Sequence, residues 1–431
     1  MLIILALFLL LIYRIIKLIR TPGERINFVI VISILSLVLF ASLAVLQYEL
    51  YLAGSKDGTV GSDSSFYYDS ALNILESGDL FSISNITEHA AGYKTWGALV
   101  LSLSPDKSVV WIKLCNVFVL LHLLLSLYCL LRKINISPKI SLLAISLISI
   151  DGIIVFTTIE NLRDIIIMFL IVQSILIMED IKDKKRLNAS LLIALPVIII
   201  MLGTLRSFLI FFILSVLCYY ILTTIKTNML RIFFIVAVAS IGVALFSVYF
   251  SGDRFNLSQA VILQRSASSV RPELAAAFSQ GSMIKRVVIG SVRYLFLPSP
   301  FKYLSVLISP DLAVYTRDVF LGFIGSFWQL QSAFLWWLLL PLIFWQLLDK
   351  KNWGRSFLIA LGIIAVMYML MYGYLWGGDA PQRQKIPIHI LGIILAAIKI
   401  GETKPKTIMA VYPLIAIPVF LASYYWGMAG N

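Results

Sequence analysis

Carboxylates and arginines that can act together in one reaction recur in the polar segments of this chain. Asp63 lies in the segment GSDSSFYYDSALNILESGDLF, and the run ENLRD contains Glu160 and Arg163. A carboxylate can accept the proton of an attacking hydroxyl, and a guanidinium can stabilise the negative charge of a departing phosphate. Asp63, Glu160 and Arg163 are therefore our candidate catalytic residues for a reaction that expels a phosphate group.

A second group of residues is a candidate for binding the substrate. The planar guanidinium of arginine stays charged at a membrane surface and binds phosphate through two parallel donors. Arginines occur in short turns between apolar runs and in the basic segment 251–319, and Tyr67 follows Asp63 closely. The candidates are Tyr67, Arg206, Arg265, Arg271, Arg293 and Arg383. Plainer interpretations stay open: a solvated loop near anionic headgroups, arginines that snorkel to the membrane surface, and a tyrosine in a loop core.

Other chemistries have little support in the sequence. The three histidines, His89, His122 and His389, are scattered and show no metal-ligand spacing, so no metal site and no cofactor are expected. The chain has no glycine-rich phosphate loop and no G-x-S-x-G motif, which argues against an ATPase and a serine hydrolase. The three cysteines form no CxxC pair.

The elements that position these residues must be membrane helices. Of the 431 residues, 60% are hydrophobic and only 13% are charged, and mean hydropathy is +0.95. Apolar runs of about 20 residues, each long enough to cross a hydrocarbon layer of about 30 Å, recur along the whole chain. We expect one all-α domain over residues 1–431, a polytopic bundle of about twelve spans without a soluble domain. The expected spans are residues 1–19, 26–47, 108–131, 140–159, 164–178, 188–205, 207–225, 232–250, 320–347, 356–376, 386–400 and 407–427.

The distribution of lysine and arginine predicts how the bundle is oriented. The short segments on one side contain 19 of these residues, and those on the other side contain four. By the positive-inside rule the richer side is cytoplasmic, so both termini and two larger loops are extracytoplasmic. These are an acidic loop, 48–107, and a basic loop, 251–319. The net charge of +13 then reflects topology and not an affinity for nucleic acid.

The first apolar run has two interpretations, a signal peptide and a retained anchor. It lacks a basic start and a small-residue cleavage site, and its basic residues follow the apolar stretch. We therefore expect a retained anchor.

An amphipathic helix is predicted inside the acidic loop. Tyr68, Ala71, Leu72 and Leu75 have the i, i+3, i+4, i+7 spacing of one buried face. Ser62 and Asp63 precede this pattern as N-cap candidates, and Gly78 follows it as a stop signal. Asp63 would then lie at the outer membrane surface, either as a catalytic carboxylate or only as a helix cap.

A further acid lies deep in an expected span. Asp151 in LISIDGIIVF is nine residues from the outer end of the span 140–159. Ionisable groups inside a membrane are costly, and they usually face a cavity. Together with the acids and arginines near the outer ends of other spans, it indicates a polar cavity that opens outward.

These motifs resemble those of GT-C membrane glycosyltransferases. The pattern Asp63-x-x-x-Tyr67-x-x-x-Ala71 resembles the acid-bearing first external loop of that family, and VRYLFLPSPFKYL at 292–304 resembles a stretch of bacterial polysaccharide-assembly proteins. ENLRD resembles their acidic–arginine turn. The overall plan is similar to O-antigen (Wzy-type) polymerases. The resemblance implies that Asp63 acts as a base or orients the acceptor, and that Tyr67 is the matching aromatic.

The resemblance implies glycan transfer between polyprenyl-(pyro)phosphate carriers outside the membrane. Three functions stay open at this point. The first is polymerisation of lipid-linked oligosaccharide repeats. The second is the addition of one sugar from a polyprenyl-phosphate donor by a GT-C transferase. The third, from another class, is a transporter of lipid-linked glycans, for which internal repeats and charges on several helices near the membrane midplane would be typical.

The expected partners and location follow from the same resemblance. The protein would bind a polyprenyl-linked glycan and membrane lipid, with other polysaccharide-assembly membrane proteins as further partners and no nucleic acid. Its location would be the bacterial cytoplasmic (inner) membrane.

Overall fold

The computed structural model of the chain describes residues 2–52, 54–55, 58–59, 62–78, 90–184, 189–206, 208–224, 283–296, 322–349, 355–376 and 382–428. Within these residues all regular secondary structure is helical, which confirms the all-α prediction. The predicted span 232–250 and most of the basic loop lie outside the described residues.

The helices follow one another with short connections over much of the chain. In chain order they are α1 (Leu2–Leu18), α2 (Pro22–Leu52), α3 (Ser62–Ser77), α5 (Ala91–Ser102), α6 (Val109–Lys133), α7 (Pro138–Ile150), α8 (Gly152–Ile159), α9 (Asp164–Lys184), α10 (Ala189–Leu205), α11 (Leu209–Thr224), α15 (Met283–Phe296), α17 (Gly322–Leu347), α18 (Ser356–Trp376), the 3₁₀ helix η5 (Gln382–Lys385), α19 (Ile386–Glu402) and α20 (Pro405–Met428).

Several of these helices can cross a membrane by length and composition. Among the described residues five qualify, and the bent pair α7–α8 would make a sixth. The five are Pro22–Leu52, Val109–Lys133, Ile324–Leu347, Arg383–Glu402 and Pro405–Ala422. The count of about twelve spans and their orientation stay predictions.

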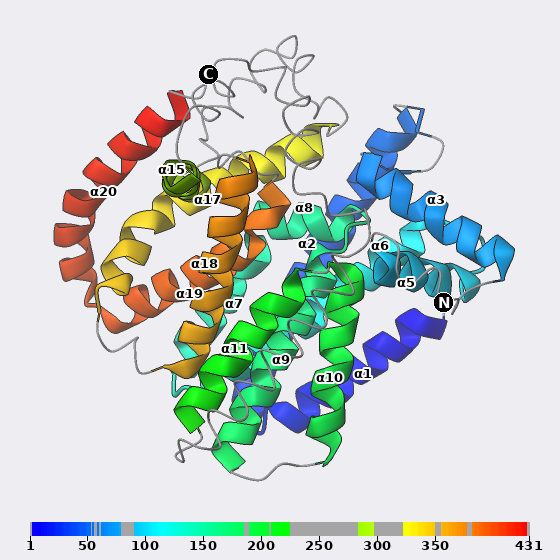
Figure 1. Cartoon of the computed structure of the whole chain (residues 1–431), viewed down its shortest axis with the longest axis horizontal. Helices are drawn as coiled ribbons and strands as arrows, with labels where there is room; N and C mark the ends of the chain where they lie inside the picture. The colour runs from blue at the N-terminus through cyan, green and yellow to red at the C-terminus, as the bar shows by residue number, and fades with distance from the viewer. Residues whose placement is uncertain are drawn as a thin grey trace.

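The bundle has a buried centre and an apolar outside. Helix α6 is strongly apolar and buried along nearly its whole length, as expected for a helix surrounded by others. Helix α20 lies along one edge of the bundle, and α3 with α5 lies at the opposite edge (Figure 1). Exposed leucines and isoleucines line α1, α2 and α20, where lipid would cover them.

The predicted span 140–159 is not one straight helix. It divides into α7 and α8, which meet at Asp151 with a bend of 57°. Asp151 caps α8, because its carboxylate accepts hydrogen bonds from the amides of Ile153 (3.0 Å) and Ile154 (3.3 Å). Gly152 allows α17 to approach, since a Cβ there would lie 1.7 Å from the carbonyl oxygen of Trp328.

Two more glycines allow close contacts along α19. A Cβ on Gly392 would lie 2.6 Å from the Trp336 ring, and one on Gly401 would lie 2.2 Å from a side-chain carbon of Ile140. Close approach of this kind favours association of helices within a bilayer, where van der Waals contact replaces the hydrophobic effect.

Helix α3 lies in the acidic loop where the sequence predicts a helix, but its buried face is turned slightly. Its most buried residues are Ser64, Tyr67, Ala71 and Ile74, whereas Tyr68, Leu72 and Leu75 are only half buried. The predicted face is confirmed in part, because Ala71 is fully buried and Tyr68, Leu72 and Leu75 pack against the hydrophobic core. Helix α3 also packs on α5, so its contact surface is broader than one stripe. Gly78 follows the helix with φ +72°, the left-handed conformation that suits glycine at a helix end.

Candidate functional site

Asp63 and Arg383 form an ion pair between two distant parts of the chain. Asp63 lies in the first turn of α3 and Arg383 lies in η5, and their side chains are in direct contact. The Asp63 side chain is 50% exposed and that of Arg383 is 21% exposed. This pair therefore forms the solvent-facing part of the site.

A second ion pair lies deeper, beside the ENLRD turn. Asp164 begins α9 and accepts from Arg206 at 2.9 Å, and both side chains are almost fully buried. Arg206, which follows α10, also donates to the hydroxyl of Tyr372 on α18 at 2.8 Å. The guanidinium thus holds the start of α9 and the end of α18 together.

Arg163 connects the same turn to α3 and α10. It donates to the carbonyl oxygen of Leu205 at 2.8 Å, and its guanidinium carbon lies 5.4 Å from the centre of the Tyr67 ring. An arginine over an aromatic face is attracted to the negative face of the ring. Arg163 and Tyr67 are both buried, so the aromatic predicted to bind substrate is in contact with the arginine predicted to act in catalysis.

A buried hydrogen-bond network fixes α3 against this turn. The Tyr93 hydroxyl donates to the side-chain oxygen of Asn161 (2.9 Å), and the Asn161 amide donates to the carbonyl oxygen of Ser64 (3.0 Å). Asn116 on α6 donates to the Tyr93 hydroxyl (3.1 Å) and to the carbonyl oxygen of Leu162 (3.2 Å). A buried network of this kind makes the position of α3, and with it that of Asp63, specific, although the side-chain oxygens of Asn116 and Ser64 have no partner among the described residues.

Two carboxyl groups of the site, those of Asp63 and Glu160, differ in their electrostatics. Burial raises the pKa of Asp63. The charge and hydrogen bond of Arg383, together with the charges of Arg163 and Arg206, lower this pKa by more in sum, so the net pKa lies below the usual value. Burial raises the pKa of Glu160 from 4.5 to about 7, even though Arg383 and other cations oppose this shift. Carboxyl pairs whose pKa values are pushed apart are typical of acid–base sites.

Aromatic residues from α15 and α18 extend the site beyond Arg206. Tyr294 on α15 stacks on Tyr372 with ring centres 6.1 Å apart, and its hydroxyl donates to the backbone oxygen of Gln384 at 2.6 Å. The ammonium of Lys385 lies 4.9 Å from the centre of the Tyr294 ring. Arg293, next to Tyr294, is 5% exposed.

Six of the residues selected from the sequence therefore lie in one cluster, which we call the arginine–carboxylate cluster. Its members are Asp63, Tyr67, Glu160, Arg163, Asp164, Arg206, Tyr372 and Arg383. Arg293 lies on the adjoining helix α15, and Arg265 and Arg271 lie outside the described residues. Sequence reasoning did not select Asp164 as a site residue, although ENLRD contains it, and it missed Tyr372, which no motif marks.

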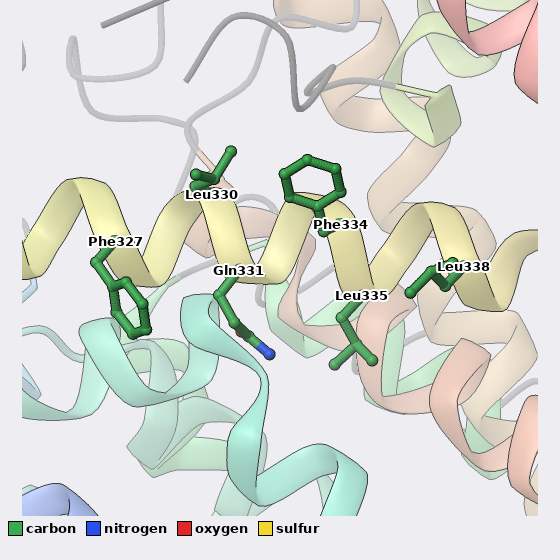
Figure 2. A pocket seen from close by; sticks show the side chains of 6 residues that line it. All are labelled: Phe327, Leu330, Gln331, Phe334, Leu335 and Leu338. Atoms are coloured by element: carbon green, nitrogen blue, oxygen red, sulfur yellow. The ribbon is translucent and has the colours of Figure 1, made fainter. Parts of the chain in front are cut away.

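An apolar pocket of about 360 Å³ lies elsewhere in the molecule, along one face of α17 (Figure 2). Phe327, Leu330, Gln331, Phe334, Leu335 and Leu338 line it, and none of them belongs to the arginine–carboxylate cluster. Within the described part of the chain no group of three or more His, Cys, Asp or Glu side chains is placed to hold a metal ion.

No protein-family model matches this chain, and no curated protein matches it.

Proposed function

We propose that this protein transfers a glycan between polyprenyl-(pyro)phosphate carriers on the outer side of a bacterial membrane. The observation that carries this proposal is the arginine–carboxylate cluster. There the charges of Arg163, Arg206 and Arg383 act on Asp63, and those of Arg383 and Lys113 act on Glu160. The pKa values of these two carboxyl groups are shifted in opposite directions. Clustered guanidiniums suit a pyrophosphate, and a carboxyl that titrates near neutral pH suits proton transfer.

The proposed reaction is a displacement at the anomeric carbon of the donor sugar. The acceptor hydroxyl oxygen forms a bond to that carbon, while the bond to the carrier phosphate oxygen breaks and its electron pair leaves with the phosphate. The hydroxyl proton passes to a carboxylate. The arginines stabilise the charge that develops on the leaving phosphate, which is where preorganised charge lowers a barrier most.

Glu160 and Asp63 have different roles in this scheme. Because the pKa of Glu160 is about 7, its carboxylate is a base of suitable strength at neutral pH. Asp63 stays ionised, is a weaker base and holds Arg383 in place, so it orients the acceptor hydroxyl and the guanidinium. Arg163, stacked on Tyr67, faces the leaving group.

The finer proposal is an O-antigen (Wzy-type) polymerase of about twelve spans with both termini outside, located in the inner membrane. A GT-C transferase that adds one sugar would use the same cluster, and the length of the product separates these two activities.

A transporter of lipid-linked glycans is the second candidate, and one observation favours it. The apolar pair α7–α8 is bent by 57° at a buried acid, and discontinuous helices are typical of secondary transporters. The cluster of acids and arginines is instead typical of an enzyme, so the transporter is the weaker proposal.

The test is to incubate the purified protein with lipid-linked repeat units and to separate the products by size. A ladder of longer glycans is expected for the polymerase, and one added sugar would select the single-sugar transferase. No product from folded protein would contradict both enzymes. The matched control is Asp69→Asn, which removes an exposed carboxylate of α3 that accepts a hydrogen bond from Ser65 at 3.2 Å on the same helix. This variant should give the wild-type ladder.

A further inference from the structure

A second group of ionisable residues lies at the break between α7 and α8, apart from the arginine–carboxylate cluster. Asp151 is 0% exposed and His389 on α19 is 1% exposed, and the Nδ1 atom of His389 lies 3.0 Å from a carboxylate oxygen of Asp151. Ser332 on α17 donates to both carboxylate oxygens, at 3.0 and 3.1 Å. Three separate segments of the chain thus converge on one buried carboxyl group.

The hydrogen bonds around Asp151 define how the imidazole is protonated. The two amides of α8 and the Ser332 hydroxyl are donors, so the carboxylate accepts throughout. His389 completes this set when Nδ1 carries a hydrogen and donates it to Asp151. Hydrogen bonds and a nearby positive charge both stabilise a buried carboxylate, and the ionisable group in contact with Asp151 is His389.

The other ring nitrogen of His389 is the unusual feature. Its Nε2 atom is fully buried and has no hydrogen-bond partner among the described residues. The ring stacks on Trp336, with ring centres 4.4 Å apart and planes 14° apart, so its orientation is fixed. A buried polar atom without a partner is costly, and it indicates a place where a proton or a hydrogen-bonding group arrives during function.

We propose that Asp151 and His389 form a proton-binding site inside the membrane. A proton from water adds to Nε2 and converts the neutral imidazole into an imidazolium, while Nδ1 keeps its hydrogen on Asp151. Release of the same proton restores the neutral ring. Intramembrane acids and histidines are rare, and they often mark proton pathways.

Two elements join this site to the arginine–carboxylate cluster. Helix α8 runs from Asp151 at its N-cap to Glu160 at its C-cap, and η5 with α19 carries both Arg383 and His389. An eight-residue helix spans only about 12 Å at 1.5 Å per residue. A change in the position of α8 or α19 therefore reaches the outer cluster directly.

Helix α17 completes the contact on the other side of the break. Gln331 points from α17 toward the start of α8 (Figure 2), where its side-chain oxygen accepts from the amide of Gly152 at 2.8 Å. Gln331 also lines the apolar pocket, and the next residue, Ser332, contacts Asp151.

The elements packed around Asp151 and His389 carry other charged groups, and several of these groups are held by contacts of their own. These groups are Glu49 on α2, Lys113 on α6, Glu160 after α8, Asp164 on α9, Arg293 on α15, and Arg383 and Lys385 in η5.

The test is nuclear magnetic resonance of the full-length protein in detergent with ¹⁵N-labelled histidine. The chain contains only three histidines, so the His389 nitrogens can be assigned as the signals that disappear in His389→Asn. Spectra are recorded from about pH 4 to about pH 10, and we expect these signals to change from the imidazolium pattern to the neutral Nδ1–H pattern as the pH rises. Asp151→Asn should move this transition to lower pH by about one unit or more, because the carboxylate no longer stabilises the cation.

Two results would overturn the proposal: His389 signals that stay constant over this pH range, or a transition that Asp151→Asn leaves in place. If either variant fails to fold, the wild-type titration still decides, since His89→Gln and His122→Gln assign the remaining signal as His389. The matched control is Ser332→Ala, which keeps the carboxylate and should move the transition far less than Asp151→Asn.

Discussion

At the residue scale, Glu160 is the group for which burial has the clearest functional consequence. If its carboxylate is the base, kcat/KM for glycan transfer should fall as the pH drops below about 7, because the carboxyl is then protonated. Glu160→Gln should remove this dependence and lower activity by about 100-fold or more. The measurement is the pH profile of kcat/KM for both proteins. The same pH dependence in the Gln variant would show that another group is responsible.

The Glu160→Gln variant should be more stable than the wild type at high pH, although it is less active. Since burial raises the pKa of Glu160 from 4.5 to about 7, the folded protein holds a proton over this range that the unfolded chain has released. This contribution to stability is complete below pH 4.5 and is lost as the pH rises to about 7. The variant should therefore melt at a higher temperature than the wild type at pH 8, as measured in detergent.

Arg383 is more exposed than the buried Arg206, so substitution of Arg383 is the clearer test of phosphate binding. Arg383→Lys keeps the charge opposite Asp63 but loses the two-pronged geometry, so kcat/KM should fall at least about tenfold at an unchanged protein level. Activity assays normalised to folded protein measure this effect. Arg206→Lys is the comparison, because Arg206 holds both Asp164 and Tyr372 in a buried setting and its loss should reduce the folded yield as well. Wild-type kinetics in Arg383→Lys would favour the solvated-loop interpretation.

Asp63→Asn separates a catalytic role from a structural role. Asparagine keeps the shape of this first-turn side chain, and the carboxylate it replaces is 50% exposed, so the free energy of unfolding should change by no more than about 1 kcal/mol. Activity should fall by about 100-fold, because the variant no longer orients Arg383 or the acceptor. Asp69→Asn, the exposed neighbour on the same helix, should stay active. A normal glycan ladder from Asp63→Asn at a normal protein level would show that the residue has only a structural role.

At the element scale, the break between α7 and α8 depends on the absence of a side chain at Gly152. A Cβ there would lie 1.7 Å from a backbone oxygen of α17, so Gly152→Ala must push the two elements apart. Overpacking of this kind costs about 1–3 kcal/mol or more, and the melting temperature in detergent should fall. Gly362→Ala on α18 is the matched control, because a Cβ there meets nothing within 4 Å. The control should be neutral or slightly stabilising, and equal losses in both variants would contradict this account.

The sequence predicted where most helices lie, but it did not predict where a helix breaks. Apolar runs of about 20 residues predict helices directly, and α3 was found from its periodicity and from Gly78. The break at Asp151 was missed because LISIDGIIVF is apolar on both sides, so it looks like one continuous span. The Asp-Gly pair at 151–152 was the available signal, since this dipeptide is typical of turns.

At the scale of the whole molecule, the site depends on contacts that no local pattern encodes. ENLRD placed Glu160, Arg163 and Asp164 together because they are neighbours in the chain. The pairing of Asp63 with Arg383 spans 320 residues, and that of Asp151 with His389 spans 238. Such pairings arise from how α3, α8 and α19 pack, and a single sequence contains no direct record of that packing.

The orientation of the bundle is a prediction for the whole chain. The lysine and arginine distribution places α3 outside and the turn between α6 and α7 in the cytoplasm. Cysteines introduced at the exposed residues Asn73 and Asn135 should differ accordingly when intact cells are treated with a membrane-impermeant thiol reagent. Asn73→Cys should be labelled, and Asn135→Cys should be labelled only after the cells are opened. The reverse pattern would place the arginine–carboxylate cluster on the cytoplasmic side.

The two glycines of α19 limit how this protein can move. Gly392, near the middle of α19, fits against Trp336, and Gly401, at its C-terminal end, fits against Ile140, with no space for a methyl group at either contact. Rotation of α19 about its axis would bring larger residues into both contacts. If α19 moves during function, it must therefore move as a rigid body together with α7 and α17. Motion relative to these three helices would then come from other helices of the bundle.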